Sequence, residues 1–347
     1  MAGMALGETA EQAAWRRRPG LRHGGRAALA LGLTLAFLLA VCAANLMFGA
    51  VHLSLSEVWS GLTSDSDVFA RNVVWQIRFP RLLDGMLVGA SLAVAGCLLQ
   101  GVTRNPLADP TILGLTAAAG LASAAAIVAN PQIPQWGIAM SCAGGGLGGA
   151  LVLYIIAWRG QVSPVRLALA GVALSAFFGA AIVALLSSSR TFLQTSLGFL
   201  AGGLYGSEWR DFHAMAPYSL IAFAAALLLS GRLNVLALGD DVAAGLGVLT
   251  DRTRLFILAV CGILTAAAVS SAGLVSFVGL VCPHLARYAV GNDNRFAIPV
   301  SALFGATLVA AADLVARLVI SPSEIPMGIV TAAVGAPFLL YFVKFRP

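Results

Sequence analysis

Runs of about 20 apolar and small residues recur along this chain, and short polar segments separate them. A run of that length is what an α-helix needs to cross the hydrocarbon core of a bilayer. The pattern therefore predicts an all-α, polytopic membrane protein with ten transmembrane helices. Their expected positions are Ala27 to about Phe48, then 82–101, 112–129, 137–158, 166–187, 212–231, 255–271, 274–290, 298–319 and 326–343.

Three other segments depart from this alternation. Residues 1–26 are polar and basic, which predicts a cytoplasmic tail ahead of a single transmembrane domain spanning 27–347. Residues 50–77 mix Ser, Asp, Glu and Trp, which predicts an external loop. Residues 190–209 are too glycine-rich and too short between their polar ends for a full span. We expect a short partial helix there, of the kind tolerated where it lines a cavity.

Residues 232–254 form the only sizeable polar interruption on the predicted inner side. Their apolar positions suit two short amphipathic helices, bent at Gly239 and at Gly245 or Gly247. Solvent-exposed helices with an apolar face favour docking of a partner protein. The alternative is a loop that folds back on the bundle.

Composition supports a membrane protein and excludes an ordinary soluble domain. Of 347 residues, 59% are hydrophobic and 10% charged, against about half and about a quarter in soluble domains. The net charge of +6 comes from basic residues that stand singly between apolar runs, so a nucleic-acid surface is not indicated. Fifteen of the 21 basic residues fall on one predicted side. The positive-inside rule then predicts cytoplasmic N- and C-termini.

Candidate chemistry is sparse. The five cysteines show no CxxC spacing and the four histidines no HExxH, so neither disulfides nor a metal site is expected. The strongest intramembrane acid is Asp313, but Arg317 follows four residues later on the same helix face. This spacing favours a local ion pair over a proton relay. The sequence thus favours neither an enzyme nor a proton-driven carrier.

Small residues spaced by four recur and let helix backbones approach closely in lipid. Close packing is the favoured interpretation, and a glycine face lining a cavity is the alternative. The groups are Gly85 and Gly89, Gly144 and Gly148, Gly145 and Gly149, and Gly171, Ser175 and Gly179.

Seven ordered motifs carry a family resemblance from about Leu29 to the C-terminus. They are RFPR at 78–81, QGVTRNPLADP at 100–110, SPVRLALAGVAL at 163–174, LNVLALGDDVAAGLGV at 233–248, FVGLVCPHLAR at 277–287, ADLVAR at 312–317 and EIPMGIVTAAVGAPF at 324–338. In this order and spacing the chain resembles the FecCD-type (BtuC-like) permease family of ABC importers for iron siderophores, haem and cobalamin.

The resemblance implies an assembly. Two permease subunits, as a homodimer or a paralogous heterodimer, would enclose the path in the cytoplasmic (inner) membrane. Two cytoplasmic ATPase subunits would use ATP, and a periplasmic or lipid-anchored binding protein would deliver substrate. The permease itself would bind no cofactor and do no bond chemistry. We therefore expect alternating-access import of a ferric siderophore, with haem or cobalamin as the alternative and an ion-coupled secondary transporter as the alternative from another class.

Roles for individual residues also follow from the resemblance. Arg78 and Arg81, with Arg317 as a third, match arginines that grip acidic residues of the binding protein; the alternatives are an Arg81–Asp84 pair or headgroup contact. Asn105, Leu107 and Ser163 match inner-gate positions. The fifth helix and the partial helix, about 166–206, would line the cavity. The expected ATPase-coupling residues are Leu238, Gly239, Asp240, Asp241, Ala244, Leu246 and Gly247.

Overall fold

The computed structural model describes residues 20–49, 51–64, 67–188, 198–321 and 323–345, and these are almost entirely helical. Strand structure in these ranges is limited to a hairpin of β1 (Trp158–Arg159) and β2 (Gln161–Val162). The long helices are α2 (Gly20–Met47), α5 (Phe79–Thr103), α6 (Leu115–Ala129), α7 (Gln135–Ala157), α8 (Pro164–Ser188), α10 (Trp209–Ala237), α12 (Thr250–Ala272), α13 (Val278–Val290), α14 (Asn294–Leu318) and α15 (Met327–Phe345).

Each of the ten predicted spans falls on one of these ten helices. The positions were predictable because the length of an apolar run reflects the thickness of the membrane. Seven segments are long and apolar enough to cross a membrane, and α6, α13 and α15 are shorter. The boundary of the predicted tail differs. Helix α2 already begins at Gly20, inside the segment 1–26, whereas residues 1–19 lie outside the described part of the chain.

The prediction that residues 50–77 form a loop is wrong, and their external location stays a prediction. This segment contains α3 (Leu55–Thr63), α4 (Val68–Asn72) and the π-helical turn η1 (Val73–Arg78), which leads directly into α5. The polar residues that suggested a loop are helix caps. Ser54 forms a capping box with Glu57, and Asp67 accepts a hydrogen bond from the Ala70 amide at 2.9 Å.

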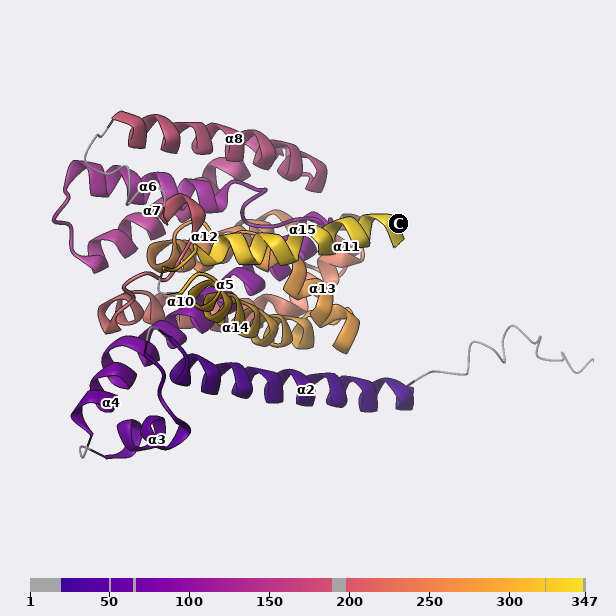
Figure 1. The fold of residues 1–347 in the computed structure, drawn as a ribbon. Coiled ribbons are helices and arrows are strands. Elements are labelled where there is room, and N and C mark those ends of the chain that lie inside the picture. Colours follow the sequence, from indigo (N-terminus) through magenta and orange to yellow (C-terminus); the bar gives the residue numbers. More distant parts are fainter. Residues whose placement is uncertain (1–19, 50, 65–66, 189–197, 322, 346–347) are drawn as a thin grey trace, which may run out of the picture.

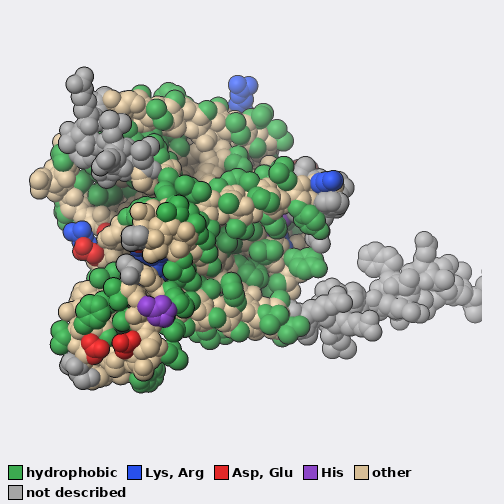
Figure 2. Space-filling model, viewed as in Figure 1, with side chains coloured by type: hydrophobic (Ala, Val, Ile, Leu, Met, Phe, Trp, Pro, Cys, Tyr) green, Lys and Arg blue, Asp and Glu red, His purple; other side chains and the backbone are tan. Residues whose placement is uncertain are grey.

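Helices α5 and α12 form the centre of the bundle (Figure 1). In the most apolar 18-residue stretch of each helix, 78% of the residues are buried in the segment containing α5 and 72% in α12, but 11% in α8. Helix α5 contacts α10, α12, α13 and α14. Helix α8 lies at one edge of the bundle and α2 at the opposite edge (Figure 1). Figure 2 shows a flank covered mainly by hydrophobic side chains, as a protein surrounded by lipid requires.

The bundle has two distinct ends (Figure 1). One, the α3 end, carries α3 and α4. The other, the α11 end, carries the short helix α11 (Asp240–Gly245), the start of α2 and the end of α15. The first and last described residues therefore lie at the same end, as an even number of spans predicts.

Close approach explains some of the glycine pairs but not all. A Cβ on Gly89 of α5 would lie 2.1 Å from the carbonyl oxygen of Gly305 in α14. Gly145 and Gly149 pack in the same way against Ala118 of α6, with distances of 2.6 and 2.4 Å from such a Cβ. In contrast, a Cβ on Gly144, Gly148 or Gly179 would meet nothing within 4 Å. Close helix packing therefore accounts for glycine at positions 89, 145 and 149, but not at positions 144, 148 and 179.

Replacing Gly89 with Ala is expected to destabilise the protein by about 1–3 kcal/mol, because the helices α5 and α14 must separate to admit the methyl group. Gly144→Ala is the matched control, since that position has free space. Unfolding of both variants in mixed micelles checks this expectation. Equal stabilities would contradict the packing role of Gly89.

Candidate functional site

The segment that was expected to contact an ATPase forms one short helix rather than two. Helix α10 continues to Ala237 and α12 begins at Thr250, so only α11 lies between them. The chain reverses at Gly239 with φ +118° and at Gly247 with φ +79°, which are backbone conformations that favour glycine. These two glycines confirm the predicted bends, whereas Gly245 is the last residue of α11.

Helix α11 has one buried side and one exposed side. Ala243 is fully buried against the bundle. Leu238 and Leu246 are each 63% exposed, and Asp241, Ala244 and Gly247 are exposed as well. The segment therefore folds back on the bundle through Ala243, which was the alternative interpretation. It also presents apolar side chains outward, as docking of a partner protein requires.

Asp240 differs from the other predicted coupling residues because its carboxylate is engaged within the chain. Its Oδ1 accepts a hydrogen bond from Arg254 Nη2 at 2.7 Å and another from Arg104 Nη2. Partial burial acts to raise the pKa of Asp240, but the hydrogen bond and charge of Arg254, followed by those of Arg104, outweigh it and lower the pKa. The carboxylate is therefore ionised at neutral pH and holds both arginines.

Arg254, one turn into α12, is almost completely buried, with 1% of its side chain exposed. Its Nη1 donates to the carbonyl oxygen of Val162 at 2.7 Å. The amide of Val162 donates to Asp251 Oδ1 at 3.0 Å. Both backbone groups of Val162, the residue before Ser163, are thus held by side chains near the start of α12.

The predicted inner-gate residues lie in two connected segments. Asn105 Oδ1 accepts a hydrogen bond from the Leu107 amide at 2.9 Å, which shapes the loop after α5. The carbonyl of Ser163 accepts from the Leu167 amide at 3.0 Å and begins α8. Ser175 Oγ of α8 donates to the carbonyl of Thr111 at 2.8 Å, so the loop and α8 are in direct contact.

At the α3 end, the predicted docking arginines meet in one buried cluster. Arg81 Nη2 lies 2.8 Å from Asp313 Oδ1 and 2.8 Å from Glu324 Oε2. Arg317 Nε lies 3.1 Å from Asp313 Oδ2, which confirms the predicted local pair. The alternative pair of Arg81 with Asp84 is wrong.

Arg78 donates to two carbonyl oxygens, those of Leu46 and Val51, beneath the segment that follows α2. Only 5% of Arg78 and 8% of Arg317 is exposed. Charges that steer an acidic partner are normally exposed on the surface. The guanidinium groups of Arg78 and Arg317 lie below it, so they could act on such a partner only from beneath the surface.

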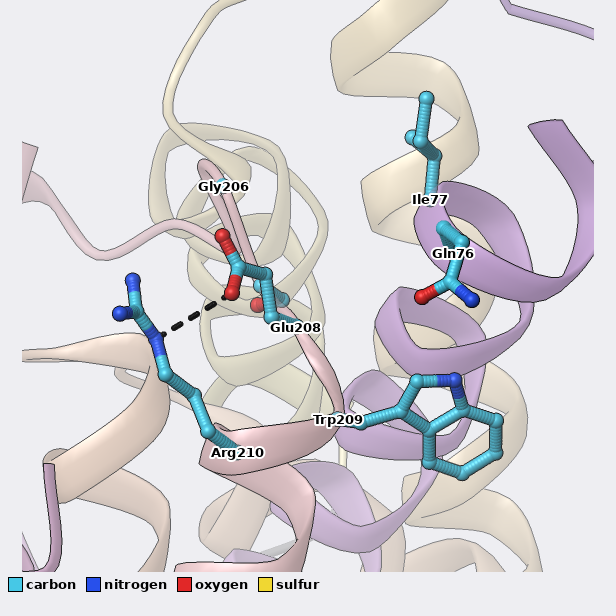
Figure 3. Close-up of a pocket in the computed structure, with 7 residues that line it drawn as sticks. Gln76, Ile77, Gly206, Glu208, Trp209 and Arg210 are labelled. Atoms are coloured by element: carbon cyan, nitrogen blue, oxygen red, sulfur yellow. Dashed lines mark ion pairs between the residues drawn. The ribbon is translucent and has the colours of Figure 1, made fainter. Parts of the chain in front are cut away.

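A pocket of about 350 Å³ opens at the same end, between η1 and the start of α10. Glu208 and Arg210 pair across 3.3 Å on one side of the pocket, and Trp209 lies on the other side with Gln76 and Ile77 (Figure 3). Trp209 Nε1 donates to the carbonyl of Trp75 at 2.7 Å, which fixes the pocket wall to η1. The accessible surface here is therefore mixed in charge rather than simply basic.

Sequence reasoning missed the structural roles of Arg104 and Arg254. Arg104 lies within the motif at 100–110 and Arg254 beyond the end of the motif at 233–248, and the partners that define their roles lie in other segments of the chain. Asp84 is fully buried, and neither carboxylate oxygen makes a hydrogen bond among the described residues, although Ser207 and Ser271 lie nearby. The cavity-lining expectation for 166–206 falls partly on residues 189–197, outside the described residues, while α8 itself presents Leu169, Val172 and Phe177 outward.

Comparison with known proteins agrees with this architecture. The sequence profile of the FecCD transport family matches residues 36–345. The Fe(3+)-citrate import permease YfmD of Bacillus subtilis is 41% identical over 86% of this chain and 90% of its own length. The cobalamin import permease BtuC of Halobacterium salinarum is 42% identical over 80% of this chain and 74% of its own.

A solved structure described as an inward-facing conformation of a metal-chelate type ABC transporter superposes with a TM-score of 0.80. Its sequence is 32% identical, and the superposition covers 91% of this chain and 98% of that one. The family profile, over residues 36–345, includes the segments that hold α11 and the arginine cluster. The chain is a multi-pass membrane protein and belongs to the FecCD transport family.

Proposed function

We propose that this chain is the permease subunit of an ATP-driven importer. The observation that carries the proposal is α11, a short helix at one end of a membrane bundle, which is flanked by the solvent-exposed side chains of Leu238 and Leu246. Apolar side chains exposed next to charged ones fit a cleft on another protein. That protein would be an ATPase, which binds ATP, and this chain would bind no cofactor.

The remaining subunits follow from the exposed surfaces. Helix α8 is apolar and barely buried, which suits contact with a second permease, identical or paralogous, across the path. The α11 end would face the cytoplasm, so that both termini are cytoplasmic in the inner membrane. The α3 end would then receive a periplasmic or lipid-anchored binding protein.

The proposed substrate is a ferric siderophore, with haem or cobalamin as the alternative. Similarity to an Fe(3+)-citrate permease and to a metal-chelate transporter favours an iron chelate. Identity alone does not decide, because the cobalamin permease is equally similar. Apart from Arg166 in its first turn, which donates to the carbonyl of Gln161, α8 carries no charged side chain that would select one chelate. Affinity would therefore lie mainly in the binding protein.

Uptake assays test this function. Cells that depend on this permease should accumulate ⁵⁵Fe supplied as a siderophore, and should not accumulate labelled haem or cobalamin. Depletion of ATP should stop uptake, while collapse of the proton gradient at constant ATP should not. Uptake that follows the ion gradient instead would support a secondary transporter.

Docking of the binding protein at Arg78, Arg81 and Arg317 remains a prediction, and burial changes how it is tested. Among the described residues, Arg78 donates to the carbonyls of Leu46 and Val51, so Arg78→Gln removes a positive charge and leaves the carboxylates of the cluster paired. We expect roughly a 3- to 10-fold loss of affinity for the binding protein at low salt, and less at high salt. Surface plasmon resonance with nanodisc-embedded permease measures this; an unchanged affinity at low salt would exclude a contribution of Arg78.

A further inference from the structure

A single carboxylate at the α11 end joins three parts of the chain. Asp240 is the first residue of α11, Arg104 is the C-cap of α5, and Arg254 lies one turn into α12. Both arginines donate to the same oxygen, Oδ1 of Asp240. Each arginine also stands beside one of the segments that contain the predicted gate residues. Movement of α11 therefore has a direct mechanical connection to both segments.

The first connection passes through Arg254 to the start of α8. The guanidinium is planar and rigid, so its Nη1 and Nη2 move together. Nη2 holds Asp240 and Nη1 holds the carbonyl of Val162, both at 2.7 Å. Val162 is itself fully buried and its amide donates to Asp251, so it must move together with the start of α12. Ser163 and α8 follow directly.

The second connection passes through Arg104 to the loop after α5. Arg104 adopts a left-handed conformation with φ 49°, which ends the helix and turns its side chain toward α10 and α11. Its Nε donates to the carbonyl of Leu236 at 3.0 Å, while Nη2 reaches Asp240. The next residue is Asn105, whose side chain shapes the turn to Leu107.

We propose that Asp240 is a positioning residue that transmits displacement of α11 to both gate segments, through Arg254 to Ser163 and through Arg104 to Asn105. This proposal rests on the proposed function, in which α11 receives the ATPase. Charge-assisted hydrogen bonds are short and directional, so they transmit a displacement that apolar contacts would absorb by sliding. Asp240 thus acts within the chain, while Leu238 and Leu246 are left to contact the ATPase.

Two variants supply matched controls. Asp240→Asn removes the charge that both arginines bind, whereas Asp240→Glu changes the same position and keeps a carboxylate beside them. Arg252→Gln removes one charge from an exposed residue in the first turn of α12, outside the expected ATPase-coupling residues. Of the three substitutions, Asp240→Asn alone takes the counter-charge away from Arg104 and Arg254.

The test uses the permease copurified with its ATPase subunits and carrying a thiol reporter, either Ser163→Cys or Leu107→Cys. The rate of maleimide labelling is measured without nucleotide and with ATP plus vanadate. In the parent protein, ATP should change the rate at both reporters. Asp240→Asn should reduce that change at both by about fivefold or more, a typical coupling magnitude. Asp240→Glu and Arg252→Gln should retain most of that change, and ATPase copurification should persist in all three variants.

Two further variants separate transmission from general damage. Arg254→Gln should remove the ATP-dependent change in labelling rate at Ser163→Cys and leave that at Leu107→Cys unchanged. Arg104→Gln should have the opposite effect. Arg104 is 34% exposed at its side chain, so its replacement tests one branch even if Arg254→Gln fails to fold. A parent-like ATP response at both reporters in Asp240→Asn would overturn the relay alone. A parent protein without any ATP response would overturn the proposed function and the relay with it.

Discussion

Replacing Asp313 with Asn is expected to lower the free energy of unfolding by about 3–5 kcal/mol, the usual cost of breaking a buried ion pair from one side. Asp313 is 2% exposed and serves two arginines. Arg81 donates to it through Nε and Nη2, and Arg317 lies 3.1 Å away. An amide carries no charge and has one acceptor oxygen instead of two, so two buried guanidinium groups lose their shared counter-charge.

Asp84→Asn is the matched control for this prediction. Asp84 is as buried as Asp313, at 0% exposed, but neither of its oxygens has a hydrogen-bond partner in the part of the chain that the structure describes. An unpaired carboxylate is costly to keep ionised there, so the neutral amide should leave stability unchanged or raise it. Unfolding of both variants in mixed micelles decides between them. A similar loss of stability in both would show that burial of an acid, rather than its pairing, determines the cost.

The arginine cluster also shows where sequence reasoning stopped. The spacing of Asp313 and Arg317 predicted their pair, because residues four apart meet on one helix face. The partners of Arg81 are 232 and 243 residues away, and no local pattern places them beside it. The nearer candidate, Asp84, lies one turn along α5 but faces Ser207 and Ser271. Only the packing of α5 against α14 decides which acid Arg81 contacts.

The helices themselves were predictable because each one reflects a simple physical requirement, the thickness of the membrane. Their ends were less so. Ser54 and Asp67 are residue types that are common in loops, but here they cap helices. The same side-chain oxygens can bond to the backbone in either setting, so the sequence alone does not distinguish them. At the other end, Asp240 and Asp241 are identical in sequence terms. Their burial and partners differ because the first turn of α11 directs one carboxylate inward and the other outward.

Replacing Leu238 and Leu246 together with Glu is expected to abolish stable association with the ATPase. The two side chains are each 63% exposed and form the apolar surface of the α11 segment. Two carboxylates placed against an apolar cleft would have to lose water without gaining partners. Even a modest total penalty of about 3 kcal/mol weakens binding by roughly a hundredfold. Copurification of the ATPase with tagged permease measures this loss.

Two variants make the result specific to α11. Leu55→Glu introduces the same change at a leucine that is 64% exposed in α3, at the opposite end of the bundle, and should leave copurification intact. Ala243→Glu places the charge on the buried side of α11 and should impair folding itself, which distinguishes loss of structure from loss of contact. Normal ATPase recovery with the Leu238 and Leu246 double variant would mean that the ATPase binds elsewhere. The exposed leucines would then be assigned to another partner, because exposed apolar side chains that are grouped together mark interaction sites.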